Sequence, residues 1–157
     1  MAAELPRCAD ATLFASDPRM LRALRDHFPA PRLLWASRHP PLPAQLRALG
    51  ERGVASVLQA SLRYRGAEHA LQVAEELGAE YIVAVLPLSM VARLAELAPA
   101  RGVTVLWAEM ELLHSGCPGA SLCPEYDPDR DAIASGRHYR FRGFKRVVRV
   151  ELVLEDW

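Results

Sequence analysis

The segment at residues 137–149 has a composition that suggests a ligand-binding function more strongly than any other part of the sequence. It carries six lysine and arginine side chains and no acid. Three aromatic residues are interleaved with these cations, namely Tyr139, Phe141 and Phe144. Basic side chains neutralise phosphates and aromatic rings stack on bases, so a strand of this kind suits a nucleic-acid ligand. Strand alternation would place His138, Arg140 and Arg142 on one face. The same charge could instead protect an edge strand from aggregation, and composition does not decide between the two.

A second group of polar residues follows the strand predicted at residues 32–36. Ser37, Arg38 and His39 come directly after it, and ligands of open α/β sheets collect beyond the carboxyl ends of strands. The guanidinium fork of Arg38 suits a phosphate, and His39 could be an acid, a base or a second cation. A solvated turn is the plain alternative, and position in a loop favours it when taken alone.

Two further loops would open at the same edge of the sheet. The loop at 59–66 holds Arg63, Tyr64 and Arg65, which could hold a phosphate and stack on a base, although we prefer a solvent-facing turn. The next loop ends in Ser89, which could offer a hydroxyl to an anion at a helix N-terminus, although capping of that helix is the preferred interpretation. The glycine-rich phosphate motifs of dinucleotide-binding and P-loop proteins are absent from the sequence.

The cysteine and histidine residues near position 120 invite a metal hypothesis. His114, Cys117, Cys123 and Glu125 lie close in sequence, but the spacing H-x2-C-x5-C is not one of the common zinc patterns. We therefore expect no metal and no cofactor. A Cys117–Cys123 disulfide is possible, yet three cysteines behind an N-terminus without an apolar signal favour unlinked thiols in a reducing, cytoplasmic compartment.

Two carboxylates follow the strand predicted at residues 103–108. Glu109 and Glu111 could serve as a base or as metal ligands, but solvated residues at the start of a helix are the preferred interpretation. Spacing alone assigns neither a Ser-His-Asp arrangement nor a glycosidase-like carboxylate pair.

Short β-like runs alternate with helical patterns along the chain. The expected strands cover 11–15, 32–36, 54–58, 81–86, 103–108 and 147–154. The expected helices cover 18–28, capped by Ser16 or Asp17, and then 43–49, 67–77 and 90–97. Glycine and proline residues indicate a long loop over 114–136. Strands separated by helices of this length form βαβ units. We predict one domain over 1–157: a Rossmann-like three-layer α/β sandwich with a mostly parallel sheet and a C-terminal basic strand or hairpin.

Composition and charge exclude several classes of protein. The chain has 157 residues, is 51% hydrophobic, and carries 19 basic and 19 acidic side chains, so its formal charge is zero. This is a globular composition rather than a disordered one. No apolar run approaches the roughly 18 residues that a transmembrane helix needs, so we expect no membrane partner. Zero net charge argues against long duplex DNA, but an acidic stretch at 125–131 offsets a basic cluster, so a short polyanion stays possible.

Two segments together resemble a known family. A strand followed by Ser37-Arg38-His39-Pro40-Pro41-Leu42-Pro43-Ala44-Gln45 is similar to the opening of small CRISPR-associated Rossmann-like proteins of type III antiviral systems. Those proteins have a strand, a [ST]-x-H or R-H element, and often L-T-x-E-Q, of which Gln45 matches the last residue. Their closing motif H-x-x-F-R resembles the segment from Arg137 to Arg142, less one residue of spacing. A glycine-containing turn is usual where Pro87-Leu88-Ser89 stands.

The resemblance implies a ring nuclease, which binds and cleaves cyclic oligoadenylate without a metal. The ribose 2′-hydroxyl would attack the adjacent phosphorus and leave a 2′,3′-cyclic phosphate. Arg38 and His39 are the implied catalytic residues. The ligand-binding set that we predict comprises Ser37, Gln45, Ser89, His138, Arg140 and Arg142. A ring with two-fold symmetry would suit a homodimer.

Two other classes of function stay open at this point. The same residues could belong to a sensor or sponge that binds a nucleotide or short RNA without cleaving it. Alternatively, the chain could be a phage- or plasmid-type interaction module whose basic strand pairs with an acidic protein. Enzymatic activity is therefore left undecided by the sequence.

Overall fold

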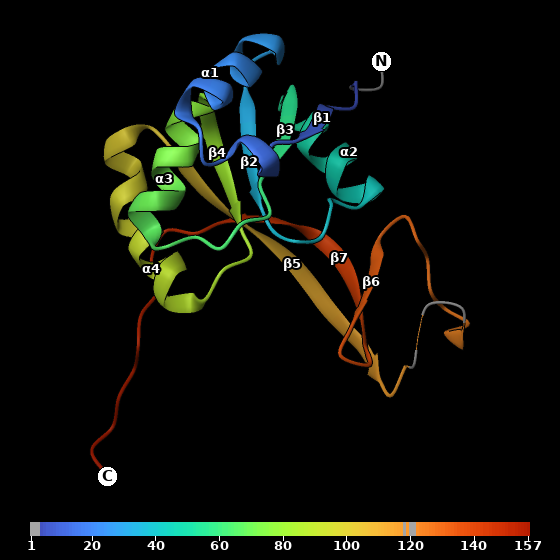
Figure 1. The fold of residues 1–157 in the computed structure, drawn as a ribbon. Helices are drawn as coiled ribbons and strands as arrows, with labels where there is room; N and C mark the ends of the chain where they lie inside the picture. Colours follow the sequence, from blue (N-terminus) through green and yellow to red (C-terminus); the bar gives the residue numbers. More distant parts are fainter. Residues whose placement is uncertain (1–3, 118, 120–121) are drawn as a thin grey trace.

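A curled, mostly parallel sheet of seven strands runs through the protein (Figure 1). The structure is a computed structural model, and it describes residues 4–117, 119 and 122–157. The strands are β1 (Arg7–Asp10), β2 (Arg32–Ala36), β3 (Ser56–Gln59), β4 (Ala79–Ala84), β5 (Thr104–Ser115), β6 (Asp131–Ala134) and β7 (Arg137–Arg146). Their order is β1-β3-β2-β4-β5-β7-β6. The first five run parallel, whereas β7 is antiparallel to both β5 and β6. The predicted mixed α/β class with a mostly parallel sheet is confirmed.

Helices pack against both faces of this sheet. They are α1 (Pro18–His27), α2 (Pro43–Glu51), α3 (Ala67–Glu76) and α4 (Leu88–Leu97), with short 3-10 turns η1 (Thr12–Phe14) and η2 (Ala98–Arg101). Figure 1 shows α1, α3 and α4 grouped on one side and α2 on the other. Among the described residues no helix is long and apolar enough to span a membrane.

Alternation along β2 creates two separate hydrophobic cores. Leu34 and Ala36 join the larger core beneath α1, α3 and α4. Leu33 and Trp35 point to the opposite face and join a smaller core, which includes Leu49 from α2. Because β2 is central and buried on both sides, its sequence is a continuous apolar run rather than an alternating one.

Local signals explain why several predicted elements form where they do. Asp17 caps α1 by accepting a hydrogen bond at Oδ1 from the Arg19 backbone N–H over 3.0 Å, and Pro18 occupies the first helical position. Gly78 follows α3 with a φ of +63°, a conformation that favours glycine at the end of a helix. These helices, together with α2, α4 and β2, agree with the sequence prediction to within about two residues.

The N-terminal strand was predicted in the wrong place. The run at 11–15 forms η1, and the strand β1 lies before it at Arg7–Asp10. β1 pairs only with β3 at the edge of the sheet, so it needs little apolar sequence of its own. Asp10 accepts a hydrogen bond from the backbone N–H of Thr12, and this local turn ends the strand.

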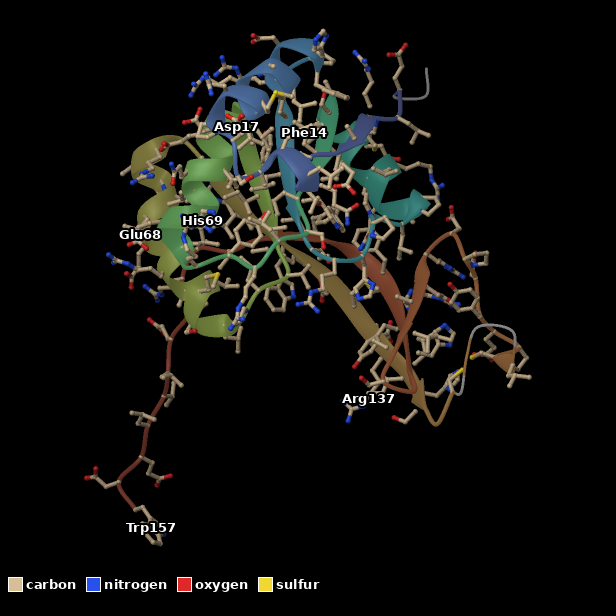
Figure 2. All side chains as sticks on the ribbon, viewed as in Figure 1. Phe14, Asp17, Glu68, His69, Arg137 and Trp157 are labelled. Carbon is tan, nitrogen blue, oxygen red and sulfur yellow. The ribbon has the colours of Figure 1, made fainter. Side chains whose placement is uncertain are left out.

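The C-terminal part differs most from the prediction. β5 continues past residue 108 to Ser115, so Glu109 and Glu111 lie on a strand and not at a helix start. Part of the predicted loop at 114–136 is β6, and the expected strand at 147–154 is absent. In Figure 1, the outer part of β5 leaves the body together with β6 and β7. We call this part of the chain, residues 109–142, the arm. Figure 2 shows Arg137 near the far end of this arm and Trp157 at the end of an extended tail.

Candidate functional site

The main crevice of the protein lies between β2 and β4, because the connections that follow these two strands lead to opposite sides of the sheet. After β2 the connection through α2 leads outward to β3, whereas after β4 the connection through α4 leads to β5 on the other side. β2 and β4 are neighbours in the sheet. Adjacent parallel strands whose loops depart in opposite directions leave a crevice at their carboxyl ends, and this is the usual ligand site of open α/β sheets.

A cavity of about 640 Å³ occupies this crevice. Its walls come from the ends of β2 and β4, the start of α2, the middle of β5 and the arm. Five of its lining side chains are large and aromatic or thioether-bearing, namely Trp35, Trp107, Met110, Tyr126 and Tyr139. Ser37, His39 and Gln45 supply polar side chains that can orient a ligand, whereas the fourth polar lining residue, Asp131, is fully buried. This volume and this mixture are typical of sites for small organic ligands.

The loop after β2 is held by hydrogen bonds to its own neighbours. The indole N–H of Trp35 donates to the carbonyl of His39 over 2.7 Å, and the His39 N–H donates to the Ser37 hydroxyl over 3.1 Å. Gln59 donates from its side chain to the Ser37 carbonyl. Gln45 accepts from the Leu42 N–H over 2.8 Å. The backbone that carries His39 is therefore positioned before any ligand arrives, while the His39 residue itself is exposed.

A smaller cavity of about 310 Å³ adjoins the first. The two share Ser37, Val85 and Leu86 among their lining residues. Arg38 and Arg63 line only the smaller one. Among the described residues neither arginine forms an ion pair, so both cations stay available to an anion. An aromatic cavity thus opens beside a basic one.

Tyr64 is neither the stacking platform that the sequence allowed nor part of the solvent-facing turn that was preferred. Its side chain is buried, and its hydroxyl donates to the Ala60 carbonyl over 2.8 Å. Burial raises the pKa of Tyr64 far above its usual range. Tyr64 lines the smaller cavity, and its ring is not presented to solvent.

The basic strand β7 is internal to the sheet, paired with β5 on one side and β6 on the other. β7 is therefore not an edge strand protected by its charge, and it is not a free strand that presents its cations to a nucleic acid. Its cations meet acids of neighbouring segments: Arg142 pairs with Glu111, and the Lys145 ammonium lies 3.8 Å from Glu109. Phe144 packs edge-on against Trp35 with the ring centroids 6.3 Å apart. Many of the basic and aromatic side chains that suggested a ligand surface are therefore engaged in contacts within the fold.

Arg140 and the acidic segment form the most buried of these pairs. Arg140 Nε and Nη2 donate to the two carboxylate oxygens of Asp131 over 2.8 and 2.9 Å, and Nη2 also donates to the Glu125 carbonyl. Asp131 is fully buried. The Arg140 guanidinium holds the pKa of Asp131 well below its usual range, although burial opposes this effect. A second tie comes from Arg47 on α2, whose Nη1 donates to Asp129 over 2.7 Å.

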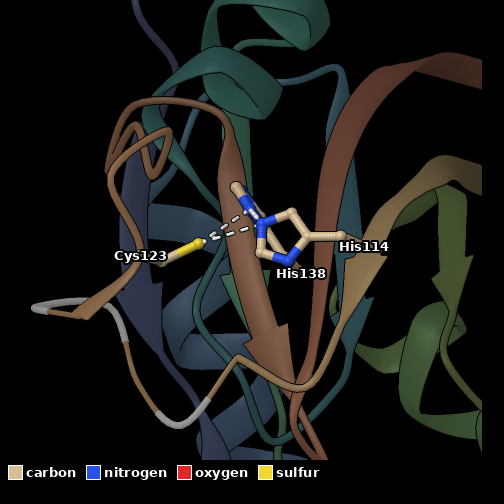
Figure 3. Close-up of side chains that lie close together, drawn as sticks. All are labelled: His114, Cys123 and His138. Atoms are coloured by element: carbon tan, nitrogen blue, oxygen red, sulfur yellow. Dashed lines mark hydrogen bonds between the residues drawn. The ribbon is translucent and has the colours of Figure 1, made fainter.

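A compact group of side chains joins the end of β5, the following loop and the start of β7. His114 Nε2, Cys123 Sγ and His138 Nδ1 form a triangle with edges of 3.0, 3.1 and 3.2 Å (Figure 3). His138 and Cys123 are buried. Burial first, and then the neighbouring Cys117 thiol, raise the pKa of Cys123. Together these atoms could hold a metal ion. The sequence pointed to His114, Cys117 and Cys123, but it placed His138 in a different site.

The structure separates the predicted ligand-binding residues into three groups. Ser37, His39 and Gln45 line the large cavity, and Arg38 lines its neighbour. Ser89 is exposed at the start of α4 and lines neither of these cavities. The remaining three residues are engaged within the arm, namely His138, Arg140 and Arg142.

Sequence reasoning missed the aromatic walls of the large cavity. Trp35 and Trp107 each stand near the end of a predicted strand, and this position was a usable signal for the rim of a crevice. Asp131, Tyr126 and Tyr139 had no such signal, because only the folding of the arm brings them there.

Comparison with known proteins gives no match: no protein-family model fits this chain, and no curated protein or solved structure is significantly similar to it. The site must therefore be interpreted from its own geometry.

Proposed function

We propose that this protein binds a short or cyclic oligoadenylate in the crevice formed by the carboxyl ends of β2 and β4 and by residues 107–110 in the middle of β5. The observation that carries the proposal is the pair of adjoining cavities, one aromatic and one holding the unpaired Arg38 and Arg63. An adenine would stack among the indole and phenol rings, while its phosphate would contact the guanidinium groups. In this proposal the fold serves as a Rossmann-like three-layer sandwich, supported by helices on both faces and by the crevice between β2 and β4.

The proposed reaction is a metal-independent cleavage of the phosphodiester. His39 would take the proton from the ribose 2′-hydroxyl, whose oxygen forms a bond to the adjacent phosphorus. The bond from phosphorus to the 5′-oxygen breaks, and the leaving 5′-oxygen takes up a proton. The products are a 2′,3′-cyclic phosphate and a free 5′-hydroxyl. Arg38 would offset the charge on the phosphoryl oxygens, which is the main contribution a protein makes to such transfers.

The size of the large cavity bears on how a ring would be bound. About 640 Å³ suits a ligand of ordinary small-molecule size, so a cyclic tetramer would extend beyond one site. We propose that two copies of the chain share such a ring across a two-fold axis, each holding half of it. We keep a reducing, cytoplasmic setting in this proposal, since the three cysteines are free thiols.

One observation favours the non-catalytic alternative. Arg140 and Arg142 form ion pairs with Asp131 and Glu111, and His138 is buried in the arm. The predicted ligand-binding set thereby loses His138, Arg140 and Arg142, whereas the predicted catalytic pair, Arg38 and His39, still lines the two cavities. A sensor that binds without cleaving needs only the stacking walls and Arg38.

The experiment measures binding and cleavage separately. Cyclic tetra- and hexa-adenylate are titrated against the protein by calorimetry, and products are followed by mass spectrometry without added divalent metal and with brief EDTA. We expect binding by the wild type, loss of cleavage in His39→Ala with binding retained, and weaker binding in Arg38→Ala. Arg19→Ala, an exposed change on α1, is the matched control. Binding without product supports the sensor, whereas no binding of either ring overturns the proposal.

A further inference from the structure

The arm holds a set of side chains that the nucleotide crevice does not use. They are His114 at the end of β5, Cys117 and Cys123 in the next segment, and His138 at the start of β7. Between Ser115 and Asp131 the described residues contain no α-helix or β-strand. The later part of this segment is tied to the fold by Arg47 and Arg140. A bound metal ion is a further way to hold such a segment, and the first part of this one carries two cysteines.

We propose that this arm contains a structural zinc site in which His114, Cys123 and His138 are ligands, while the buried Cys117 thiol beside Cys123 moves in to complete a tetrahedron. The inference is independent of the function proposed for the crevice.

The spacing of the three placed donor atoms fits such a site. Zinc bonds of about 2.0–2.1 Å to nitrogen and 2.3 Å to sulfur separate tetrahedral ligand atoms by about 3.3 Å for two nitrogens and 3.6 Å for nitrogen and sulfur. The two histidine nitrogens lie 3.0 Å apart, and Cys123 Sγ lies 3.1 and 3.2 Å from them. Each edge thus opens by less than about 0.5 Å to admit the ion.

The protonation of the cluster also favours a cation. Asp131 accepts at Oδ2 over 2.8 Å from His138 Nε2. A carboxylate can only accept, so Nε2 carries a proton; when the ring holds this proton alone, Nδ1 presents a lone pair to the cluster. The uncharged cluster has at most two protons, on the Cys123 thiol and the His114 ring, for three close contacts. A central metal ion would instead accept a lone pair from each of the three side chains drawn in Figure 3.

Asp131 gives His138 the outer partner that metal-binding histidines usually have. A carboxylate that accepts from the other ring nitrogen fixes the orientation of the ring and strengthens its basicity. Here the carboxylate is itself held by two hydrogen bonds from Arg140 and by the backbone N–H of Asp127 over 2.9 Å. These hydrogen bonds hold the carboxylate, and through it the buried His138 ring, in one orientation.

The nature of the ligands selects the metal and its role. Two thiolates and two imidazoles in a tetrahedron are typical of zinc rather than of the oxygen-preferring Mg²⁺ or Ca²⁺. Cys117, Cys123 and His138 are all buried. A closed site with four protein ligands is structural, whereas a catalytic site keeps a position open for water. The ion would join residues 114 and 138 and hold the intervening segment against the sheet.

The test uses the whole reduced chain, purified without chelators from cells supplied with zinc. Elemental analysis should find about one zinc per chain, and replacement by Co²⁺ should give thiolate charge-transfer bands with the intense visible bands of a tetrahedral ion. Cys123→Ser and His114→Gln should weaken zinc binding by more than about 100-fold, and Cys117→Ser by at least about 10-fold. Cys8→Ser is the matched control, because Cys8 is an exposed thiol on β1.

Several results would overturn the inference. One is a reduced protein, folded by circular dichroism, that binds neither zinc nor Co²⁺. Another is an equal loss of zinc in Cys8→Ser and Cys123→Ser, which would mean non-specific thiol binding. A native Cys117–Cys123 disulfide detected by mass spectrometry would exclude the site. Unchanged affinity and an unchanged Co²⁺ spectrum in Cys117→Ser would refute the closed, four-ligand form.

Discussion

Replacement of Arg140 by alanine tests whether the arm depends on its buried ion pair. Arg140 donates two hydrogen bonds to Asp131, which has no solvent exposure, while the arginine side chain is 16% exposed. Arg140→Ala leaves a buried carboxylate with only His138 and the Asp127 N–H as partners. Removing one partner of a buried pair costs about 3–5 kcal/mol, and we take about 3 because of the partial exposure.

Arg142→Ala is the matched control for this substitution. Arg142 lies two residues along the same strand and pairs with Glu111, but both side chains are about half exposed, at 45% and 51%. Pairs of this kind contribute about 0–1 kcal/mol. The structure therefore predicts that Arg140→Ala lowers the free energy of unfolding by more than about 2 kcal/mol relative to Arg142→Ala.

Urea unfolding followed by circular dichroism measures this difference at equal zinc concentration. With an m value of about 2 kcal/mol/M, Arg140→Ala should lower the midpoint by about 1.5 M. Thermal unfolding should shift by about 6–12 °C. Arg142→Ala should move either midpoint only slightly. If the two variants agree to within about 0.5 kcal/mol, Arg140 does not support the arm in the way its contacts indicate.

Three further predictions concern the cavities and their surroundings. Trp107→Ala should weaken oligoadenylate binding in titrations by about 5- to 150-fold, since a base stacked on an aromatic ring contributes about 1–3 kcal/mol; Trp157→Phe in the exposed tail should leave the affinity unchanged, and equal effects would refute stacking at the crevice. Arg38→Ala should reduce the slope of log affinity against log salt by about 1, because one phosphate contact is lost; Arg19→Ala should keep the full slope, and an unaltered slope in the Arg38 variant would exclude that contact. Burial raises the pKa of Tyr64, so this residue stabilises the fold fully below the unfolded-state value near 10, and that contribution is lost as pH rises towards the folded-state value. Urea midpoints between pH 8 and 11 should therefore fall less steeply in Tyr64→Phe than in the wild type, and parallel curves would contradict this.

The helices and central strands are encoded by short-range patterns, which is why they could be predicted. Asp17 and Pro18 set the start of α1 through local capping geometry. The apolar run of β2 reflects burial on both faces of a parallel sheet. From these elements the carboxyl-edge loops followed, and with them Ser37, Arg38 and His39, which do lie at the crevice. Gln45, which was predicted from the family resemblance, lies there as well.

The arm could not be derived in the same way. β6 consists of four residues within a segment rich in glycine and proline, and it is a strand only because β7 pairs with it. β7 looked like a free basic surface, since nothing local indicates that Glu111 and Asp131 lie opposite its arginines. Cross-strand charge pairing depends on register, and register arises from contacts between distant segments.

The α/β class, the residues of the crevice loop and the two cysteines beside a histidine follow from the sequence alone. Which of these groups come into contact depends on the tertiary structure. His138 lies 24 positions from His114, yet the antiparallel pairing of β5 with β7 places the two in register and their ring nitrogens 3.0 Å apart. The same pairing occupies Arg140 and Arg142 and brings Asp131 to the wall of the cavity. The physical reason is that side-chain chemistry is local, whereas the distance between two side chains is set by the pairing of strands far apart in the chain.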